Sequence, residues 1–169
     1  MSSVGRRVRR GLLVLVMALL VPSSASFAGD TPNVSPAQRK VQDIVASLKD
    51  RLSLPAPVVV AIEASNTLML SVEAPAAQGS PFTLAVDGPF LETLTDVELE
   101  AAVAHELGHV WVFTHHPYLQ TEELANQIAM RVVTRESLQH VYEKMWKQNG
   151  TKGNLLEFLG PVAGGLSAR

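Results

Sequence analysis

The segment His105-Glu106-Leu107-Gly108-His109 combines two metal-binding side chains with an acid. Residues four apart share one face of an α-helix, so His105 and His109 can direct two imidazole nitrogens at one metal ion. Glu106 then lies where a carboxylate can take a proton from a metal-bound water. This H-E-x-x-H spacing is typical of zinc-dependent hydrolysis. The alternative, a helix carrying two solvated histidines, is disfavoured by the neighbouring residues, which predict a packed helix.

That helix is predicted to begin at Thr95 and to end near Thr114. Thr95 and Glu98 have the form of a capping box, in which a hydroxyl N-cap is followed three residues later by a glutamate. Pro117 prevents the helix from continuing. An apolar stripe suited to burial is formed by Val103, Leu107, Val110 and Trp111. The H-E-x-x-H residues are therefore expected in the middle of a packed helix.

A catalytic zinc usually has three protein ligands and one open position for water, and His115 is one candidate for the third ligand. It follows His109 by six residues, which is the spacing of the motif H-E-x-x-H-x-x-G-x-x-H. The glycine of that motif turns the chain, but Val112 stands at its position here, and a β-branched residue is poorly suited to positive φ. If the helix continues, His115 rotates off the ligand face.

Glu122 is the other candidate for the third ligand. The chain is expected to open a new helix after Pro117, with Thr121 as N-cap. Glu122 and Asn126 share a face, so Glu122 can bind the metal while Asn126 orients a ligand histidine. Alternatively, Glu122 and Glu123 are ordinary first-turn acids. The apolar side of this helix is expected to continue at near-helical spacing through Leu124, Ile128, Val132, Leu138, Val141 and Met145.

Together, H-E-x-x-H at 105–109 and Glu-x-x-Ala-Asn at 122–126 resemble the gluzincin metallopeptidases. The similarity is to the group of CAAX prenyl proteases, HtpX-type peptidases and small soluble minigluzincins, which carry E-x-x-A-D on a glutamate helix. It covers about Val58 to Met130, roughly half of the chain without its N-terminal segment. The resemblance implies one zinc ion, with Glu106 as general base and three ligands: His105, His109 and Glu122.

Two further features follow from this resemblance. Asn126 stands where the family has aspartate, and an amide carries no charge to raise the basicity of a ligand histidine. The residues Asn66, Thr67 and Leu68 lie where the family has an edge strand, which implies that an extended peptide substrate pairs there.

A residue that stabilises the oxyanion is not assigned; the neighbouring candidates in the sequence are Tyr118 and His116, with His140 further along the chain.

The remaining elements predict an α+β fold. Ser35 and Pro36 begin a helix as N-cap and first residue, and its helical spacing runs to Leu52. Strands are expected at 58–62, 67–73 and 82–86. The result is a small zincin-type domain with an N-terminal helix, a small mixed β-sheet, the H-E-x-x-H helix and the glutamate helix. The tail from residue 150 to 169 is expected to pack on the domain or to fray.

The first 28 residues have the pattern of a secretory signal peptide. An apolar core at 11–21 and small residues ending at Ala28 follow a basic segment formed by Arg6, Arg7, Arg9 and Arg10. Cleavage after Ala28 leaves one metallopeptidase domain at 29–169, exported to the periplasm or the extracellular space. An uncleaved anchor is the alternative, and the choice between Sec and twin-arginine export stays open.

Charge and composition limit the classes of molecule that this protein can bind. Removing residues 1–28 takes away four arginines and no acid, so the formal charge falls from −2 to −6, which argues against nucleic acid. After the first 30 residues there is no apolar run of about 20 residues that would span a membrane. The chain contains no cysteine, which excludes disulfides. We expect a monomer that acts on peptide or protein substrates.

The function predicted from these features is that of a zinc-dependent endopeptidase. The alternative is a non-catalytic zinc-binding or chaperone-like envelope protein derived from a peptidase. Glu106 counts against it, because metal binding alone does not require that glutamate. A metal-free interaction domain would leave His105, Glu106 and His109 unexplained.

Overall fold

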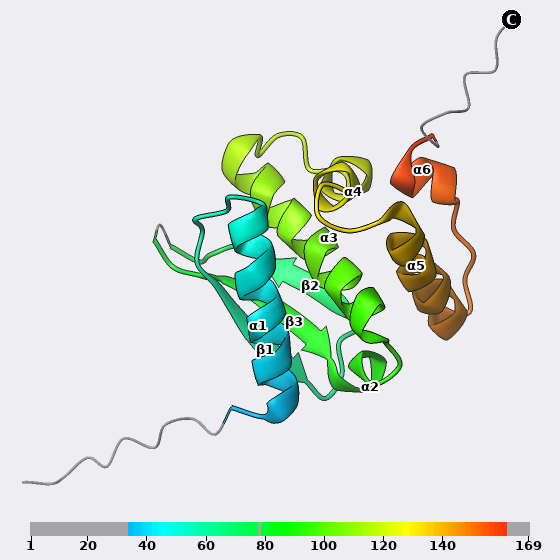
Figure 1. The fold of residues 1–169 in the computed structure, drawn as a ribbon, viewed down its shortest axis with the longest axis horizontal. Coiled ribbons are helices and arrows are strands. Elements are labelled where there is room, and N and C mark those ends of the chain that lie inside the picture. Colours follow the sequence, from blue (N-terminus) through cyan, green and yellow to red (C-terminus); the bar gives the residue numbers. More distant parts are fainter. Residues whose placement is uncertain (1–33, 78, 162–169) are drawn as a thin grey trace, which may run out of the picture. The chain divides into compact units, whose positions relative to one another are not determined.

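The computed structural model describes residues 34–77 and 79–161, and the predicted signal peptide therefore lies outside the described residues. One helix, a small sheet and then further helices follow one another, as predicted for an α+β domain (Figure 1). In chain order, the elements are α1 (Pro36–Arg51), β1 (Val58–Glu63), β2 (Leu70–Glu73), β3 (Phe82–Asp87), α2 (Gly88–Leu91), α3 (Asp96–His115), α4 (Glu122–Ala129), α5 (Arg135–Asn149) and α6 (Leu155–Leu159). None of the helices in the described ranges is long and apolar enough to cross a membrane.

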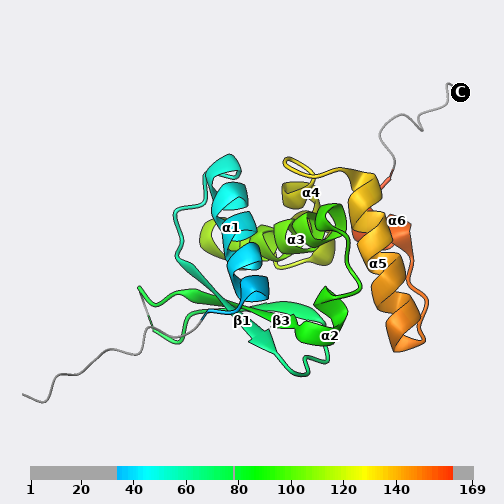
Figure 2. The ribbon, with the colours of Figure 1, turned by 60° about the horizontal axis from the view of Figure 1, so that its bottom comes forward.

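The sheet is mixed, as the sequence predicts, with strand order β1-β3-β2. β1 runs parallel to β3, and β2 runs antiparallel to it. Helices α1 and α3 lie on the same side of this sheet (Figure 2). Leu84 and Val86 of the central strand are buried, at 1% and 0% exposure. β2 is consequently an edge strand whose outer backbone groups have no strand partner within the sheet.

The edge strand begins later than predicted, at Leu70 rather than Thr67. The Asn66 side chain folds the preceding residues into a turn: it accepts from the Leu68 N–H at 2.9 Å and donates to Ser71 Oγ at 3.2 Å. Met69 then has a φ of +65°, a left-handed conformation that no strand residue adopts. Asn66, Thr67 and Leu68 therefore shape the entry to the edge strand and are not part of it.

Helix α3 lies at the centre of the fold and begins as predicted. Thr95 Oγ1 accepts from the Glu98 N–H, and the Glu98 carboxylate accepts from the Thr95 N–H at 2.7 Å, which completes the capping box. Helices α1, α4 and α5 and strand β2 all pack against it. The burial consequently extends beyond one stripe, and the fully covered side chains include Ala101, Val103, Ala104, Leu107, Val110 and Val112. A helix enclosed in this way gives its polar residues fixed surroundings.

The predicted long helix after Thr121 is two helices. The chain leaves α4 after Ala129, and Thr134 caps a new helix by accepting from the Ser137 N–H at 3.1 Å. α5 takes a different direction from α4 and packs against α3 (Figure 1). The apolar spacing survives this break because both helices bury one face, which is why the sequence pattern looked continuous.

The first part of the C-terminal tail packs on the domain. Its short helix, α6, contacts α4 and α5, and Leu159 is only 2% exposed. Arg135 at the start of α5 donates to the carbonyl oxygens of Leu159 at 2.6 Å and Gly160 at 2.7 Å. Residues 162–169 lie outside the described part of the chain.

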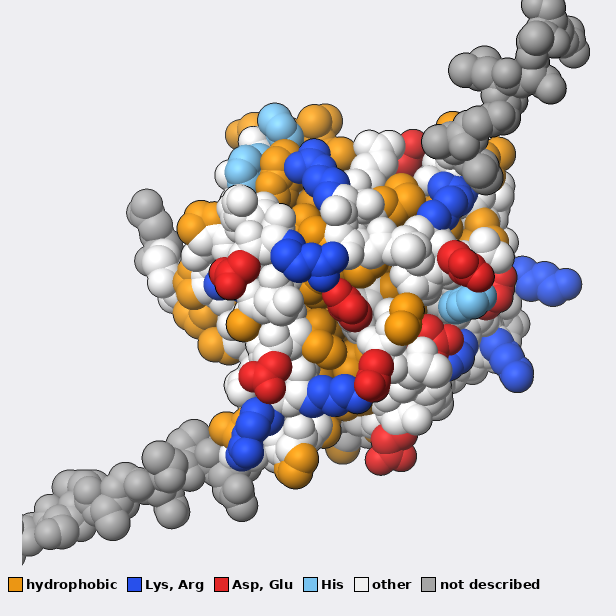
Figure 3. All heavy atoms as spheres, in the orientation of Figure 1, with side chains coloured by type: hydrophobic (Ala, Val, Ile, Leu, Met, Phe, Trp, Pro, Cys, Tyr) orange, Lys and Arg blue, Asp and Glu red, His pale blue; other side chains and the backbone are white. Residues whose placement is uncertain are grey.

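On the face seen in Figure 3, acidic and basic side chains alternate over α1 and α3. Two ion pairs join these helices: Lys40 with Asp96 at 2.5 Å, and Arg51 with Glu100 at 2.6 Å. Exposed pairs of this kind contribute at most about 1 kcal/mol. The buried apolar side chains Val41, Val45 and Leu48 of α1 therefore account for most of the adhesion between α1 and the rest of the domain.

A more buried ion pair ties α5 to the start of α3. Lys144 Nζ lies 2.6 Å from Glu98 Oε2 and 2.7 Å from the carbonyl oxygen of Thr93. Burial alone would raise the pKa of Glu98, but the hydrogen bonds from Lys144 and Thr95 outweigh it and lower the pKa to about 2. This contact holds α5 in place at Lys144, two residues after Tyr142.

We expect Glu98→Gln to lower the free energy of unfolding by roughly 2 kcal/mol at pH 7. Because the folded-state pKa of Glu98 is depressed, its contribution is complete above the ordinary value of 4.5 and is lost as the pH falls towards about 2. Urea unfolding at pH 7 and pH 3 should therefore show a smaller difference between parent and variant at pH 3. Glu100→Gln, at the exposed pair, is the control with little effect at either pH. An equal Glu98→Gln difference at both pH values would contradict this account.

Candidate metal centre

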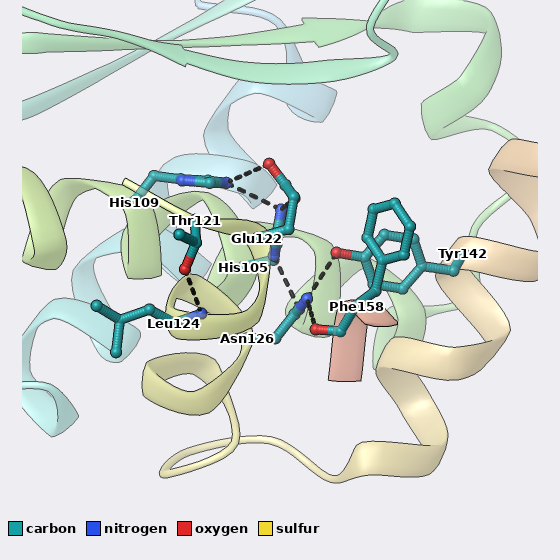
Figure 4. Close-up of polar contacts among 8 residues, drawn as sticks. All are labelled: His105, His109, Thr121, Glu122, Leu124, Asn126, Tyr142 and Phe158. Carbon is teal, nitrogen blue, oxygen red and sulfur yellow. Dashed lines mark hydrogen bonds and ion pairs between the residues drawn. The ribbon is translucent and has the colours of Figure 1, made fainter. Parts of the chain in front are cut away.

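Three potential ligands meet where α3 and α4 cross (Figure 4). His105 and His109 come from α3, and Glu122 comes from the first turn of α4. His105 Nε2 lies 3.2 Å from His109 Nε2 and 3.2 Å from Glu122 Oε2, and His109 Nε2 lies 3.4 Å from Glu122 Oε1. Among the described residues, this is the one group of three or more metal-ligating side chains whose ligand atoms gather within 4.8 Å.

The size of this triangle fits zinc. Zinc binds histidine nitrogen and carboxylate oxygen at about 2.0–2.2 Å in a tetrahedron, which separates neighbouring ligand atoms by about 3.3 Å. The His105–His109 and His105–Glu122 separations, both 3.2 Å, are close to that value, and His109 contacts the other oxygen of Glu122 at 3.4 Å. The three side chains would supply three ligands to one zinc ion, and all three line the same cleft.

The charges of the site also favour a cation. Burial by itself would lower the pKa of His105, but the hydrogen bond to Glu122, the charge of Glu106 and the hydrogen bond to Asn126 together raise it. The hydrogen bonds from His105 and His109 in turn hold the pKa of the Glu122 carboxyl well below its usual range. Positive charge is thus stabilised between these side chains, and a divalent cation can take the place of the proton.

Asn126 fixes which nitrogen of His105 is free to bind a metal. Its Nδ2 lies 2.7 Å from the Tyr142 hydroxyl and 2.9 Å from the Phe158 carbonyl oxygen, which can only accept. The amide nitrogen must therefore face Phe158, and the amide oxygen faces His105 Nδ1 at 2.9 Å. That oxygen can only accept, so Nδ1 carries the proton and the lone pair of Nε2 points into the ligand triangle.

Gly108 permits the close crossing of the two helices. A Cβ atom at this position would lie 2.3 Å from the carbonyl oxygen of Ala125 on α4, a distance that backbone atoms cannot tolerate. The absence of a side chain lets α4 approach α3 so closely that Glu122 reaches both histidines. Glycine inside a helix costs about 1 kcal/mol relative to alanine, and a packing requirement of this kind offsets such a cost.

Glu106 lies beside the ligands and is 7% exposed. Burial raises the pKa of its carboxyl, while His105 and His109 and a hydrogen bond from the Val72 backbone act in the opposite direction without cancelling the rise. Glu106 lines the same cleft as the three ligands. A buried carboxylate with a raised pKa that lines a cleft is a candidate for a general base.

The other candidate residues lie apart from this triangle. His115 stacks on Trp111 with ring centroids 4.1 Å apart and is exposed, because α3 continues to this residue without the turn that would bring it back. Tyr118 is 98% exposed, and the ring of His116 lies beside Trp111. His140 lines a separate surface hollow with Lys144. The structure therefore brings Glu122, and not His115, to the histidine pair.

Tyr142 is a site residue that the sequence did not indicate. It is 5% exposed, its ring lies 5.8 Å from that of His105, and burial raises its pKa, so the hydroxyl stays protonated. A single straight helix from Thr121 would place it about 30 Å from Glu122. Thr134, which caps α5, was the signal for the break that brings Tyr142 back to the site.

The ligands line a cleft of about 550 Å³ between β2 and α5. Leu68, Leu70, Ser71 and Val72 form its strand side. Asn66 and Thr67 of the predicted edge are not among its lining residues. The Asn66 side chain instead donates to the carbonyl oxygen of Ala85 on β3 at 3.3 Å. Apolar side chains also line the cleft, namely Met145 and Trp146 from α5, Phe82 from β3 and Phe113 from α3.

This combination of an α+β domain, a His-His-Glu triangle and a buried glutamate is that of a zinc metallopeptidase. Residues 35–168 match the model of peptidase family M48, and the chain belongs to that family. A solved structure described as the metallopeptidase zymogen abylysin of Pyrococcus abyssi is 18% identical, with a TM-score of 0.49 over 68% of this chain and 99% of that chain. No curated protein matches this sequence.

We expect Glu122→Ala to abolish stoichiometric zinc binding, because it removes one corner of the ligand triangle. Glu123→Ala is the matched control: Glu123 is the next residue, is exposed, and contacts Gln127 at 3.2 Å instead of the histidines. Metal analysis after dialysis should find one zinc ion per chain in the parent and in Glu123→Ala, and far less in Glu122→Ala. The reverse result would identify Glu123 as the ligand. Loss of zinc with His115→Ala would instead indicate that His115 is the third ligand.

Proposed function

We propose that this protein is a zinc-dependent endopeptidase in which His105, His109 and Glu122 hold the metal. The observation that carries the proposal is the convergence of these three side chains, with one ligand atom of each within 4.8 Å of the others, beside a buried Glu106 in an open cleft. When bound there, zinc supplies a Lewis acid that polarises a substrate carbonyl and lowers the pKa of a water molecule.

Glu106 would act as the general base. Its raised pKa suits a group that accepts a proton from the attacking water and later donates it to the leaving amine. The Glu106 carboxylate is buried near His105 and His109, and it still lines the cleft. Asn126 holds His105 in the tautomer that leaves Nε2 free.

The substrate would bind in extended form along β2. The Asp87 N–H donates to the Met69 carbonyl, so in the alternating antiparallel pattern Ser71 turns its backbone groups towards β3. Val72 then turns its backbone groups towards the cleft, in agreement with the hydrogen bond between the Val72 backbone and Glu106, whereas the Leu70 N–H donates to the Leu68 carbonyl at 2.8 Å and leaves only the Leu70 carbonyl on this edge. An extended peptide can pair with such an edge almost independently of its sequence, and the apolar side chains that line the cleft then favour apolar substrate side chains.

The alternative is a non-catalytic zinc-binding protein. It would use the same three ligands, but it would have no need of a buried Glu106 with a raised pKa beside them. If residues 1–28 act as a signal peptide, the enzyme and its substrates meet in the periplasm or outside the cell.

Glu106→Gln is expected to retain zinc and the fold while losing about 10²–10⁴-fold in turnover, because glutamine cannot accept the proton. Cleavage of casein or a peptide library should be followed beside metal analysis of the same preparations. A variant that cleaves as fast as the parent would show that Glu106 is not the base. A parent that binds zinc but cleaves nothing would favour the non-catalytic alternative.

Val72→Pro should lower kcat/KM for a peptide substrate by about fivefold or more, because it removes a backbone hydrogen bond of the strand edge that also contacts the Glu106 carboxylate. Proline removes the outward N–H and is tolerated on an edge strand, whereas Val72→Ala shortens the side chain and keeps the N–H as a control. Zinc content should be unchanged in both variants. An unchanged kcat/KM in Val72→Pro would contradict a role for this N–H, and a peptide mimic bound elsewhere in a structure would contradict pairing at this edge.

A further inference from the structure

We propose that α6 is a positioning element of the metal centre, and that residue 126 must be an asparagine because its amide donates to the Phe158 carbonyl of α6. The inference deepens the proposed function, since it rests on His105 being a metal ligand. It gives the C-terminal segment a role in orienting His105 that is separate from metal ligation and from proton transfer by Glu106.

The first step is the number of hydrogen bonds at Asn126. This side chain is fully buried, and its amide nitrogen has two protons and two acceptors, Tyr142 Oη at 2.7 Å and the Phe158 carbonyl oxygen at 2.9 Å. Its oxygen serves His105. An aspartate would offer a charged acceptor to His105, but it would also bring a carboxylate oxygen against the Phe158 carbonyl. Two buried acceptors facing each other would be strongly unfavourable.

The second step is how α6 holds that carbonyl in place. Leu159 is buried as an apolar anchor, and Asn154 caps the helix by accepting from the Leu156 N–H at 3.0 Å. Arg135 binds the last carbonyls of α6, those of Leu159 and Gly160. The Phe158 ring packs at 5.1 Å from the ring of Tyr142. The position of the Phe158 carbonyl is therefore set by contacts with both α4 and α5.

The third step is the path from α6 to the ligands. Asn126 connects to His105 directly, and the Tyr142 hydroxyl, which accepts from Asn126, lines the same cleft as Glu122. One buried network consequently contacts a ligand from α3 and borders the cleft that holds a ligand from α4. If α6 shifts, the Asn126 amide loses its fixed orientation, and His105 loses the acceptor that selects its tautomer.

The test measures zinc affinity of the full chain by competition with a chelator. Asn126→Asp is expected to weaken zinc binding by at least about tenfold, the lower end of the effect of a residue that orients a ligand. Hydrogen exchange at the amides of α6 should become faster in the same variant. If Asn126→Asp binds zinc as tightly as the parent and α6 keeps its protection, the proposal is wrong.

A matched pair on α6 separates positioning from general stability. Leu159→Ala removes the buried anchor, whereas Leu156→Ala changes a side chain that is 60% exposed on the same short helix. Zinc affinity should fall with Leu159→Ala and stay unchanged with Leu156→Ala. In the Leu159→Ala background, Asn126→Asp should cost much less than in the parent, because the opposing carbonyl is no longer held in place. Additive effects of the two changes would overturn the proposal.

A second way of loosening α6 covers the case that Leu159→Ala does not fold. Arg135→Ala removes the two hydrogen bonds to the end of α6, and Arg131→Ala, which alters a cation–π contact with Trp111, is its control. Zinc binding should weaken only with Arg135→Ala, and equal affinity in both variants would count against the proposal. These measurements do not depend on proteolysis: if the parent cleaves no peptide but its zinc affinity responds as expected, the endopeptidase proposal fails and the positioning role stands.

Discussion

The close crossing of α3 and α4 at Gly108 is the constraint on which the rest of the site depends. The backbone of Ala125 occupies the space that a Cβ on Gly108 would need, and this approach sets the distance of Glu122 from the two histidines. Glu122 also stands in the first turn of α4, where the helix dipole favours a carboxylate. Helix α1 and strand β2 pack against α3 and hold it in place, and α4 packs against α3 as well. A site made from two helices can then have the separations that a tetrahedral ion requires.

The same geometry places two carboxylates beside the two ligand histidines, and this arrangement favours a bound cation. Glu106 and Glu122 lie near two imidazoles, and their neighbourhood raises the pKa of His105 and lowers that of Glu122. Protons and metal therefore compete for the same position, because a histidine must be neutral to act as a ligand. A metal bound only by the folded chain adds its binding free energy to stability, and this contribution is relevant to a domain that has no disulfides.

The local features of this fold could be predicted from the sequence, and the features formed by distant residues could not. The capping box at Thr95 and Glu98 places the helix start, and the spacing of His105, His109 and Glu122 indicates ligands on helix faces. The break before α5 was missed because both helices bury apolar residues at compatible spacing. Tyr142 and Phe158 meet Asn126 only after that break and after α6 has folded back, so no short pattern encodes their contact. The departure of Asn126 from aspartate is visible in the sequence, but its reason is visible only in the partners of its amide.

The start of β2 links local backbone conformation to the placement of Glu106. The Asn66 turn and the positive φ of Met69 set where the strand begins, and hence which residues turn towards β3. Side chains and backbone groups alternate with a period of two, so a shift of one residue would direct the backbone groups of Ser71, rather than Val72, into the cleft. The Val72 backbone would then no longer reach the Glu106 carboxylate, and the edge would present a different set of donors and acceptors to a peptide. A strained turn that contacts neither the metal ligands nor Glu106 thus determines the register in which the general base and an extended substrate share one strand edge.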